Sequence, residues 1–293
     1  MRLRTFLTSL TSLAAGGAAV AQDLPIIGQP TQGQTGFQPA VTEVMQDIVW
    51  LDNMLLIVCV AITLFVVALL ALCLVKFNRK ANPEPSTFTH HTPVEVAWTI
   101  VPIIILVFIG AFSLPVLFKQ QEIPEAEVFI KATGYQWYWG YEYPDHEIEF
   151  DSYMIGVDSG NQLTPETSQA LADAGYSDQQ FLLATDTSVV IPTGKIVVVQ
   201  VTGADVIHAW TIPAFGVKQD AVPGRLAEMW FEVEEGQEGI YFGQCSELCG
   251  LNHAYMPITV KAVTQDEYDA WVAESQVAGR YVEPGQVQVA ASE

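Results

Sequence analysis

Two long uncharged stretches dominate the pattern of hydrophobic and polar positions along the chain. One runs from Met54 to Val75 and the other from Val96 to Phe118, about 22 and 23 residues. An α-helix rises about 1.5 Å per residue, so each stretch can cross a hydrocarbon core of roughly 30 Å. The pattern therefore predicts a transmembrane helical hairpin within residues 46–118, with spans at about 54–75 and 96–118.

Positive charge is concentrated between these two stretches. Lys76, Arg79 and Lys80 form the densest basic cluster in the sequence. Basic loops mark the cytoplasmic side of a membrane. We therefore expect the loop inside the cell, and both the N-terminal arm and the large C-terminal part outside.

The N-terminal segment has the pattern of an export signal. Arg2 and Arg4 precede a short apolar run, and Ala19-Val20-Ala21 is a small-x-small cleavage site. A first membrane helix is the alternative, but Thr, Ser and Gly interrupt the run. We interpret residues 1–21 as a signal peptide. Residues 22–45, rich in Gln, Gly, Pro and Thr, predict a mobile N-terminal arm.

The remainder reads as one globular domain over residues 119–278. Short runs of β-branched and aromatic residues alternate with turn residues, which predicts an antiparallel sandwich or barrel. The predicted strands are 127–133, 136–143, 189–192, 195–203, 208–212, 225–233, 239–243 and 258–262.

Two stretches of this domain depart from the strand pattern. Residues 156–185 are polar with a weak helical pattern at 164–174, and predict an insertion between strands. Thr264 and Glu267 form a capping box that predicts a short helix over 264–273. Residues 279–293 show no hydrophobic pattern, and we therefore predict a flexible tail there.

Charge is as uneven as hydrophobicity. From Lys119 onward there are 27 Asp and Glu against 7 Lys and Arg, so almost the whole net charge of −21 lies in the C-terminal domain. Such a domain excludes nucleic acid as a partner and favours a basic protein, whose encounter rate an acidic surface raises. The plainer alternative is that acidity provides solubility only.

One segment carries most of the candidate chemistry. Cys245, Cys249, His253 and Met256 lie within twelve residues, and His208 lies upstream at the start of a predicted strand. Thiolate and thioether ligands favour copper, and imidazole suits it. A mononuclear blue-copper site uses two His, one Cys and one Met. The second cysteine would allow two thiolates to bridge two copper ions.

Other chemistries of these cysteines remain open at this point. Cys245 and Cys249 could form a disulfide, or join two histidines in a structural zinc site, although that would leave Met256 without a role. The Cys-x-x-Cys of thioredoxin-like redox pairs and the Cys-x-x-Cys-His of covalent haem are absent from the sequence. Cys59 and Cys73, inside the first predicted span, are interpreted as inert packing residues.

The combination of His208 with Cys245-x3-Cys249-x3-His253-x2-Met256 resembles the binuclear Cu(A) site of cytochrome c oxidase subunit II. The aromatic segment Gln136–Tyr143 resembles that of the same family, as does the hairpin. The resemblance covers roughly residues 40–275, and the long insertion resembles bacterial aa3-type members. It implies a two-helix transmembrane hairpin followed by an all-β, cupredoxin-like Greek-key barrel.

The resemblance also implies the ligands of two copper ions. Cys245 and Cys249 bridge the ions, His208 and Met256 complete one, and His253 with the backbone carbonyl of Glu247 completes the other. The Glu247 side chain is implied to bind a magnesium ion shared with subunit I. Its alternative is a solvated surface carboxylate.

The implied activity is electron transfer. Electrons from cytochrome c would enter at Trp137, with Glu142, Asp186 and Asp205 as docking carboxylates. They would pass to the haem of subunit I, which reduces oxygen to water and pumps protons, so no catalytic residue is expected in this chain. Trp137 could instead be a core aromatic.

Glu95 is implied to lie at the mouth of a proton path of subunit I. The plainer alternative is a carboxylate that the dipole favours near a helix N-terminus. The expected partners are subunit I and other oxidase subunits, cytochrome c and the lipid bilayer.

Rival functions share parts of this pattern. A quinol oxidase subunit II has the architecture but lacks the copper ligands. A copper-delivery protein would explain the ligands but not the aromatic segment or the hairpin. Nitrous oxide reductase would need a large catalytic domain in the same chain.

Overall fold

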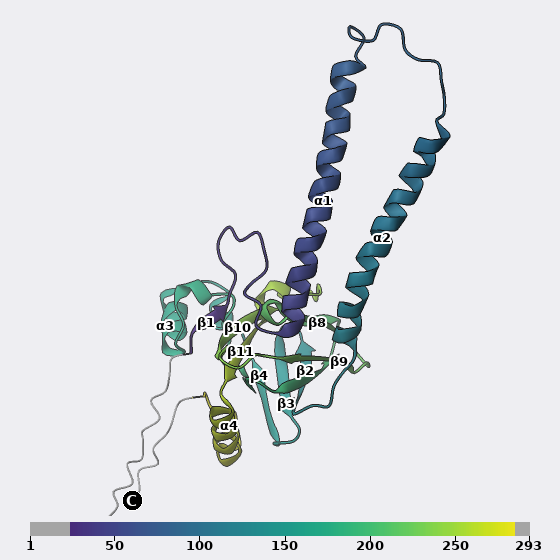
Figure 1. The fold of residues 1–293 in the computed structure, drawn as a ribbon. Coiled ribbons are helices and arrows are strands. Elements are labelled where there is room, and N and C mark those ends of the chain that lie inside the picture. The colour runs from purple at the N-terminus through teal and green to yellow at the C-terminus, as the bar shows by residue number, and fades with distance from the viewer. Residues whose placement is uncertain (1–23, 285–293) are drawn as a thin grey trace, which may run out of the picture.

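The computed structural model describes residues 24–284. The predicted signal peptide and the last part of the predicted tail lie outside the described residues. Within this range, two long helices extend from a β-rich domain. They lie closer together at the end where they join the domain (Figure 1).

The hairpin consists of α1 (Glu43–Lys76) and α2 (Thr92–Gln121). Both helices are long and apolar enough to cross a membrane, and each extends beyond the uncharged stretch that predicted it. Thr42 caps α1, since its hydroxyl accepts a hydrogen bond from the backbone N–H of Met45 at 3.0 Å. At the end of the hairpin next to the β-rich domain, Lys119 of α2 forms ion pairs with Glu43 and Asp47 of α1, each at 2.8 Å. These ion pairs hold the two helices together.

The β-rich domain contains two larger sheets and a strand pair. All eight predicted strands are confirmed, and β1, β4 and β8 are additional. One sheet has the order β1 (Ile26–Gly28), β10 (Gly239–Gln244), β11 (Pro257–Val263) and β5 (Val189–Pro192). The other has the order β4 (Ile148–Ser152), β3 (Tyr138–Tyr143), β2 (Val128–Tyr135), β6 (Ile196–Gly203) and β9 (Ala227–Glu232). The pair is β7 (His208–Ile212) with β8 (Val217–Ala221).

The sequence had suggested an antiparallel arrangement of the strands. In the structure three strand pairs are parallel instead. β2 pairs with β6, β5 with β11 and β1 with β10 in parallel. The partners in each parallel pair are far apart in sequence, and long crossovers allow parallel pairing where short hairpins cannot. The antiparallel expectation holds for hairpins such as β2–β3 and β3–β4.

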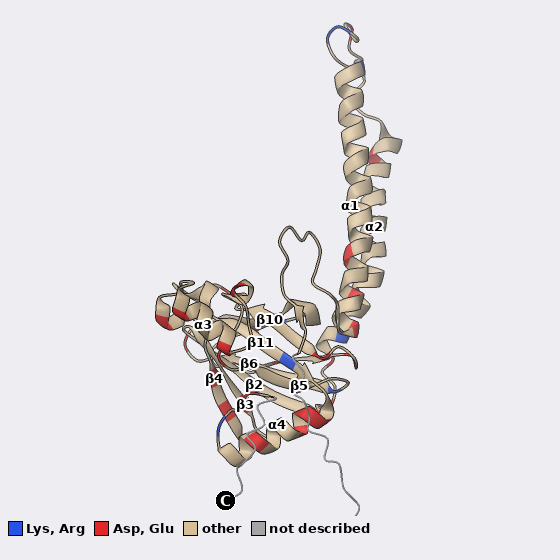
Figure 2. Ribbon diagram, turned by 90° about the vertical axis from the view of Figure 1, so that its left-hand side faces the viewer, with Lys and Arg blue, Asp and Glu red and all other residues tan. Residues whose placement is uncertain are grey.

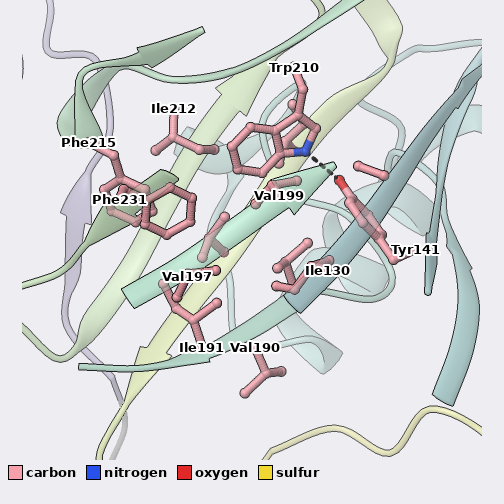
Figure 3. Packing of buried hydrophobic residues seen from close by; sticks show 14 of the residues in the cluster. Ile130, Tyr141, Val190, Ile191, Val197, Val199, Trp210, Ile212, Phe215 and Phe231 are labelled. Carbon is pink, nitrogen blue, oxygen red and sulfur yellow. Dashed lines mark hydrogen bonds between the residues drawn. The ribbon is translucent and has the colours of Figure 1, made fainter. Parts of the chain in front are cut away.

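A large aromatic core fills the space between the sheets. Trp210 on β7 is fully buried, and its indole N–H donates to the hydroxyl of Tyr141 on β3 at 3.2 Å (Figure 3). Phe231 and Phe215 lie on the same side, with ring centroids 4.8 Å apart. Burial of this much aromatic surface is the main term that holds such a domain together.

The predicted C-terminal helix is present as α4 (Gln265–Ala278), and its capping box is formed by Thr264 and Glu267. The predicted tail is partly built into the domain. Trp271 of α4 donates to the carbonyl of Val282 at 2.9 Å, and the ring of Tyr281 lies 4.7 Å from that of Phe150. The expectation of a flexible tail is therefore corrected for residues 279–284, because aromatic packing holds them.

The insertion and the N-terminal arm form a second, smaller core on the outer face of β10. The insertion contains α3 (Pro165–Asp173), and Leu171 packs with Tyr176, Ile240 and Phe242. Ile26 of β1 packs against the same cluster. The arm expected to be mobile thus contains a paired strand, because its apolar residues cover the outer face of the sheet.

The hairpin is fixed to the domain at the first turn of α1. Val41, Val44 and Met45 are buried, and the Thr42 hydroxyl donates to the carbonyl of Phe215 at 2.8 Å. At the end of α2, Trp230 of β9 donates to the carbonyl of Lys119 at 3.1 Å. The helices and the domain are therefore packed together at their junction rather than joined by a free linker.

Candidate metal centre

Three segments bring the predicted ligands together. The loop after β10 carries Cys245 and Cys249, and a short 3-10 turn (His253–Tyr255) leads into β11 just after Met256. His208 begins β7, whose neighbour in space is β10. Cys245, Cys249, His208 and Met256 are buried, and His253 is half-buried.

The sulfur atoms of Cys245 and Cys249 lie 3.9 Å apart. That is about twice the S–S bond of about 2.05 Å, so both thiols are free and the disulfide alternative is wrong in this structure. Metal–sulfur bonds of about 2.3 Å would let one ion contact two sulfurs up to ~4.6 Å apart. The pair is thus spaced to share a metal.

The other predicted ligands surround this pair. The Cys249 sulfur lies 3.4 Å from Met256 Sδ and 3.6 Å from His253 Nδ1. The Cys245 sulfur lies 3.9 Å from His208 Nδ1 and 3.3 Å from the carbonyl oxygen of Glu247. Five side chains and one carbonyl of the predicted set therefore meet in one place. This soft donor set fits copper.

The cysteine pair is electrostatically asymmetric without metal. Burial alone would raise the pKa of Cys245, but hydrogen bonds involving His208 and the backbone outweigh it and lower the pKa. Burial and the neighbouring Cys245 thiolate raise the pKa of Cys249. Since thiolates are the metal-binding form, metal binding must displace a proton from this pair.

His208 is held from its other side by Asp205. The carboxylate oxygen Oδ1 lies 2.9 Å from His208 Nε2, and Asp205 also accepts hydrogen bonds from the backbone N–H groups of Gln136 and Val206. A carboxylate on the far nitrogen of a metal-binding histidine fixes its tautomer and orientation. Sequence reasoning gave Asp205 a docking role and missed this one. The signal was a carboxylate three residues before a candidate ligand.

Close packing leaves the His208 ring little freedom. A Cβ at Gly134 would lie 2.8 Å from ring atoms of His208, so only glycine fits there. The buried indole of Trp139 contacts the ring edge-on, with centroids 6.0 Å apart. The neighbouring strands β2 and β3 thus position a ligand that belongs to β7.

Trp137 lies against the backbone of the loop that carries Cys245 and Cys249. Its indole N–H donates to the carbonyl of Cys249 at 3.3 Å, and the Gln136 amide donates to the same oxygen at 2.7 Å. The side chain is half-buried, so one part of the ring faces solvent. The aromatic segment therefore connects a predicted ligand, Cys249, with the surface.

The remaining predicted residues lie outside this cluster. Glu142 pairs with Lys131 at 2.7 Å, and Asp186 accepts from the backbone N–H of Tyr153 at 2.8 Å. The Glu247 side chain is exposed. Glu95 accepts from the backbone N–H of His91 at 3.0 Å, at the start of α2 in the hairpin. None of these four side chains has a hydrogen bond or ion pair to the ligand side chains in the described part of the chain.

Known proteins match both parts of this chain, the hairpin and the β-rich domain. Residues 128–263 match the family described as cytochrome c oxidase subunit II, periplasmic domain, and residues 30–116 match its transmembrane domain. Cytochrome c oxidase subunit 2 of Cereibacter sphaeroides is 59% identical over 285 residues, covering 94% of this chain and 93% of the relative. That of Arabidopsis thaliana is 41% identical, covering 83% and 90%.

A solved structure is similar as well. The periplasmic domain of subunit II of cytochrome oxidase of Bradyrhizobium japonicum is 44% identical, covers 53% of this chain and 98% of its own length, and has a TM-score of 0.43. The two family matches fall on the hairpin and on the β-rich domain that contains the ligand cluster. The chain is a membrane protein with two spans, and it belongs to the cytochrome c oxidase subunit II family.

Proposed function

We propose that this chain is the electron-entry subunit of its haem–copper oxidase. It takes electrons from cytochrome c at a binuclear copper centre, Cu(A), and passes them to the haem of subunit I. The observation that supports this most directly is the single buried cluster of two thiols, two imidazoles and one thioether.

Two copper ions would share these ligands. Cys245 and Cys249 would bind both ions, His208 and Met256 would be the further ligands of one, and His253 with the Glu247 carbonyl would be those of the other. When bound, the copper pair supplies one-electron redox chemistry with the electron shared between both ions. The protein keeps the site dry through burial and fixes His208 through Asp205 and Gly134. A rigid site changes little on reduction, which suits a relay.

Electron entry is assigned to Trp137. Its hydrogen bond to the Cys249 carbonyl gives a short path from a half-exposed ring to a copper ligand. The acidic domain would attract a basic cytochrome c. Asp205 is engaged with His208 and Glu142 with Lys131, whereas Asp186 has no ion pair among the described residues. Of the three carboxylates, Asp186 is therefore the one with no cationic partner among the described residues, although it accepts a hydrogen bond from the backbone N–H of Tyr153.

Two further roles belong to the proposal. The exposed Glu247 side chain would bind the magnesium ion shared with subunit I. Glu95 would lie at the mouth of a proton path, which agrees with its place at the loop end of α2 in the hairpin. Oxygen reduction and proton pumping would take place in subunit I of the bacterial inner membrane, with the termini of this chain periplasmic.

Electron paramagnetic resonance tests the copper assignment. The full chain in detergent, loaded with copper, should bind two ions and show the hyperfine pattern of one electron shared equally by two copper nuclei. The Met256→Leu variant should still bind two copper ions, but the electron should no longer be shared equally between them. One ion with the pattern of a single nucleus would contradict the binuclear site and favour a copper carrier.

Stopped-flow reduction by cytochrome c tests the entry residue. In Trp137→Phe the copper spectrum should be retained, because Gln136 still bonds to the Cys249 carbonyl. The reduction rate should fall by at least an order of magnitude at saturating cytochrome c, where docking no longer limits it. An unchanged rate would remove Trp137 from the pathway and leave the copper assignment intact.

A further inference from the structure

We propose that a cavity between the β3–β4 turn and α4 binds a calcium ion. The cavity has a volume of about 460 Å³ and is lined by residues 142–149 of the β3–β4 hairpin and by residues of α4 and its C-terminal end. Figure 1 shows α4 and the β3–β4 turn at the end of the β-rich domain opposite the hairpin. This inference does not depend on the copper proposal.

Three glutamates line the cavity from the β3–β4 hairpin. Glu142 on β3 lies directly opposite Glu149 on β4 in the antiparallel ladder, and Glu147 lies in the turn between the strands. Figure 2 shows acidic residues on this hairpin and on α4 at the same end of the domain. Like charges directly opposite each other destabilise an antiparallel strand pair. A bound cation would remove that repulsion.

Cations of the chain itself offset this charge only in part. Lys131 on β2 pairs with Glu142 at 2.7 Å. Glu147 and Glu149 are exposed and have no ion pair in the described part of the chain. Arg280 also lines the cavity, but three carboxylates against this one guanidinium leave the lining acidic.

A buried hydroxyl in the cavity wall points independently to a ligand. Ser275 of α4 is 1% exposed, lines the cavity, and its Oγ has no hydrogen-bond partner. Buried polar atoms nearly always have a partner in a native protein. The next residue, Gln276, donates its amide N–H to the carbonyl of His146 at 2.9 Å, which leaves its amide oxygen as an acceptor. Hence α4 adds two neutral oxygen donors to the three carboxylates.

This donor set suits calcium. Calcium takes six to eight oxygen ligands in flexible geometry, whereas magnesium demands a near-ideal octahedron and keeps several waters. Among the described residues, three ligand atoms of His, Cys or carboxylate groups lie within 4.8 Å of one another at the copper cluster and not here. The exposed glutamates must therefore turn inward on binding, which costs side-chain entropy. We expect a dissociation constant of about 10⁻⁴–10⁻³ M, as in extracellular calcium modules.

Competition with terbium measures the affinity. Terbium(III) replaces calcium in oxygen-donor sites, and light absorbed by the nearby Tyr143 should excite its luminescence. In the full chain in detergent, calcium should displace this signal in the concentration range given above. Glu147→Gln with Glu149→Gln should weaken calcium binding about tenfold or more, because affinity follows the number of charged ligands.

A matched control tests whether the loss is local. Glu228→Gln with Glu232→Gln removes two exposed glutamates from β9 of the same sheet, and should leave calcium affinity unchanged. No saturable calcium binding in the wild type, or an equal loss in both double variants, overturns the proposal. Copper content and spectrum of each variant check that the domain is folded.

Ser275→Ala tests the buried hydroxyl. Without calcium this variant should be as stable as the wild type or more stable, because it removes an unpaired buried hydroxyl. Calcium should raise the thermal unfolding temperature of the wild type by binding the folded state, and this rise should be smaller in Ser275→Ala. An equal rise in both would show that the hydroxyl is not a ligand, and would overturn the proposal. Binding of zinc in place of calcium, with loss in His146→Gln, would overturn it as well.

Discussion

The two pairs of cysteines show how differently the two parts of this molecule use the same residue. Cys59 and Cys73 lie on α1 with their side chains exposed. The most hydrophobic stretch of this helix contains no buried residue. Cys245 and Cys249 are buried, and each has a histidine nitrogen within 3.9 Å. In the β-rich domain this chain's own contacts fix a residue's role. In the hairpin, surrounding lipid or partner subunits must do so.

The largest test of this comparison exchanges sulfur for oxygen in each pair. Cys249→Ser should abolish the shared-electron copper spectrum, because a hydroxyl cannot replace a bridging thiolate. Cys59→Ser with Cys73→Ser should leave copper content and spectrum unchanged. Copper analysis and visible absorption of the purified oxidase measure both. Loss of copper in the helix variant would mean that the hairpin takes part in metal binding.

A second test compares tryptophans. Trp210 is fully buried and bonded to Tyr141, whereas Trp98 of α2 is 65% exposed. Trp210→Ala should destabilise the domain by about 3–5 kcal/mol through cavity formation. Trp98→Ala should leave domain unfolding unchanged. Denaturant unfolding followed by near-UV circular dichroism would measure this. Equal effects would argue that the hairpin and the domain unfold as one unit.

Asp205 gives a test within the metal centre. Asp205→Asn removes the charge that holds His208 while preserving shape, and such partners typically contribute about 10–100-fold in metal affinity. Competition with a copper chelator should show that loss. Asp220→Asn, on the neighbouring strand β8 and without an ion pair in the described chain, is the control. An equal affinity for both variants would return Asp205 to a purely docking role.

The smallest expected effect concerns Lys261, a buried cation on β11. Burial lowers its pKa from 10.5 to about 8, and this outweighs its pairing with the partly exposed Glu283. Between these values the unfolded chain binds more protons than the folded one, so stability should rise with pH. Lys261→Met should be neutral or stabilising and should remove this rise between pH 8 and 10. Thermal unfolding at several pH values measures it, and a stability that falls with pH would contradict the sign.

Much of this architecture could be predicted from the sequence because the signals are local. Uncharged length gave the two helices, alternation gave eight strands, and ligand spacing gave the copper loop. The missed strands lack such signals. β1 has three residues and exists because β10 offers it an edge, and β8 carries Lys218, Gln219 and Asp220 in the middle of its short run. Parallel pairing is likewise decided between distant segments.

The site shows the same limit. Residue type and spacing identified the five side chains of the proposed copper site, since soft donors are rare enough to stand out, whereas the Glu247 carbonyl came only from the family resemblance. The residues that hold the ligands in place could not be found that way. Gly134 matters only because His208 from another strand lies against it, and Gln136 matters because its amide meets the Cys249 carbonyl. These contacts depend on the packing of β2, β3 and β7, which spacing does not reveal.

The pairing of β1 with β10 has a consequence for how the protein matures. The two strands lie on opposite sides of the hairpin in sequence, yet they pair on the same side of the membrane. β1 must therefore remain unpaired on that side of the membrane until both helices are inserted and the last third of the chain is synthesised and translocated. Until then the edge of β10 has no partner, and an open strand edge is a site for mispairing. Closure of this edge makes completion of the fold a late event in biogenesis.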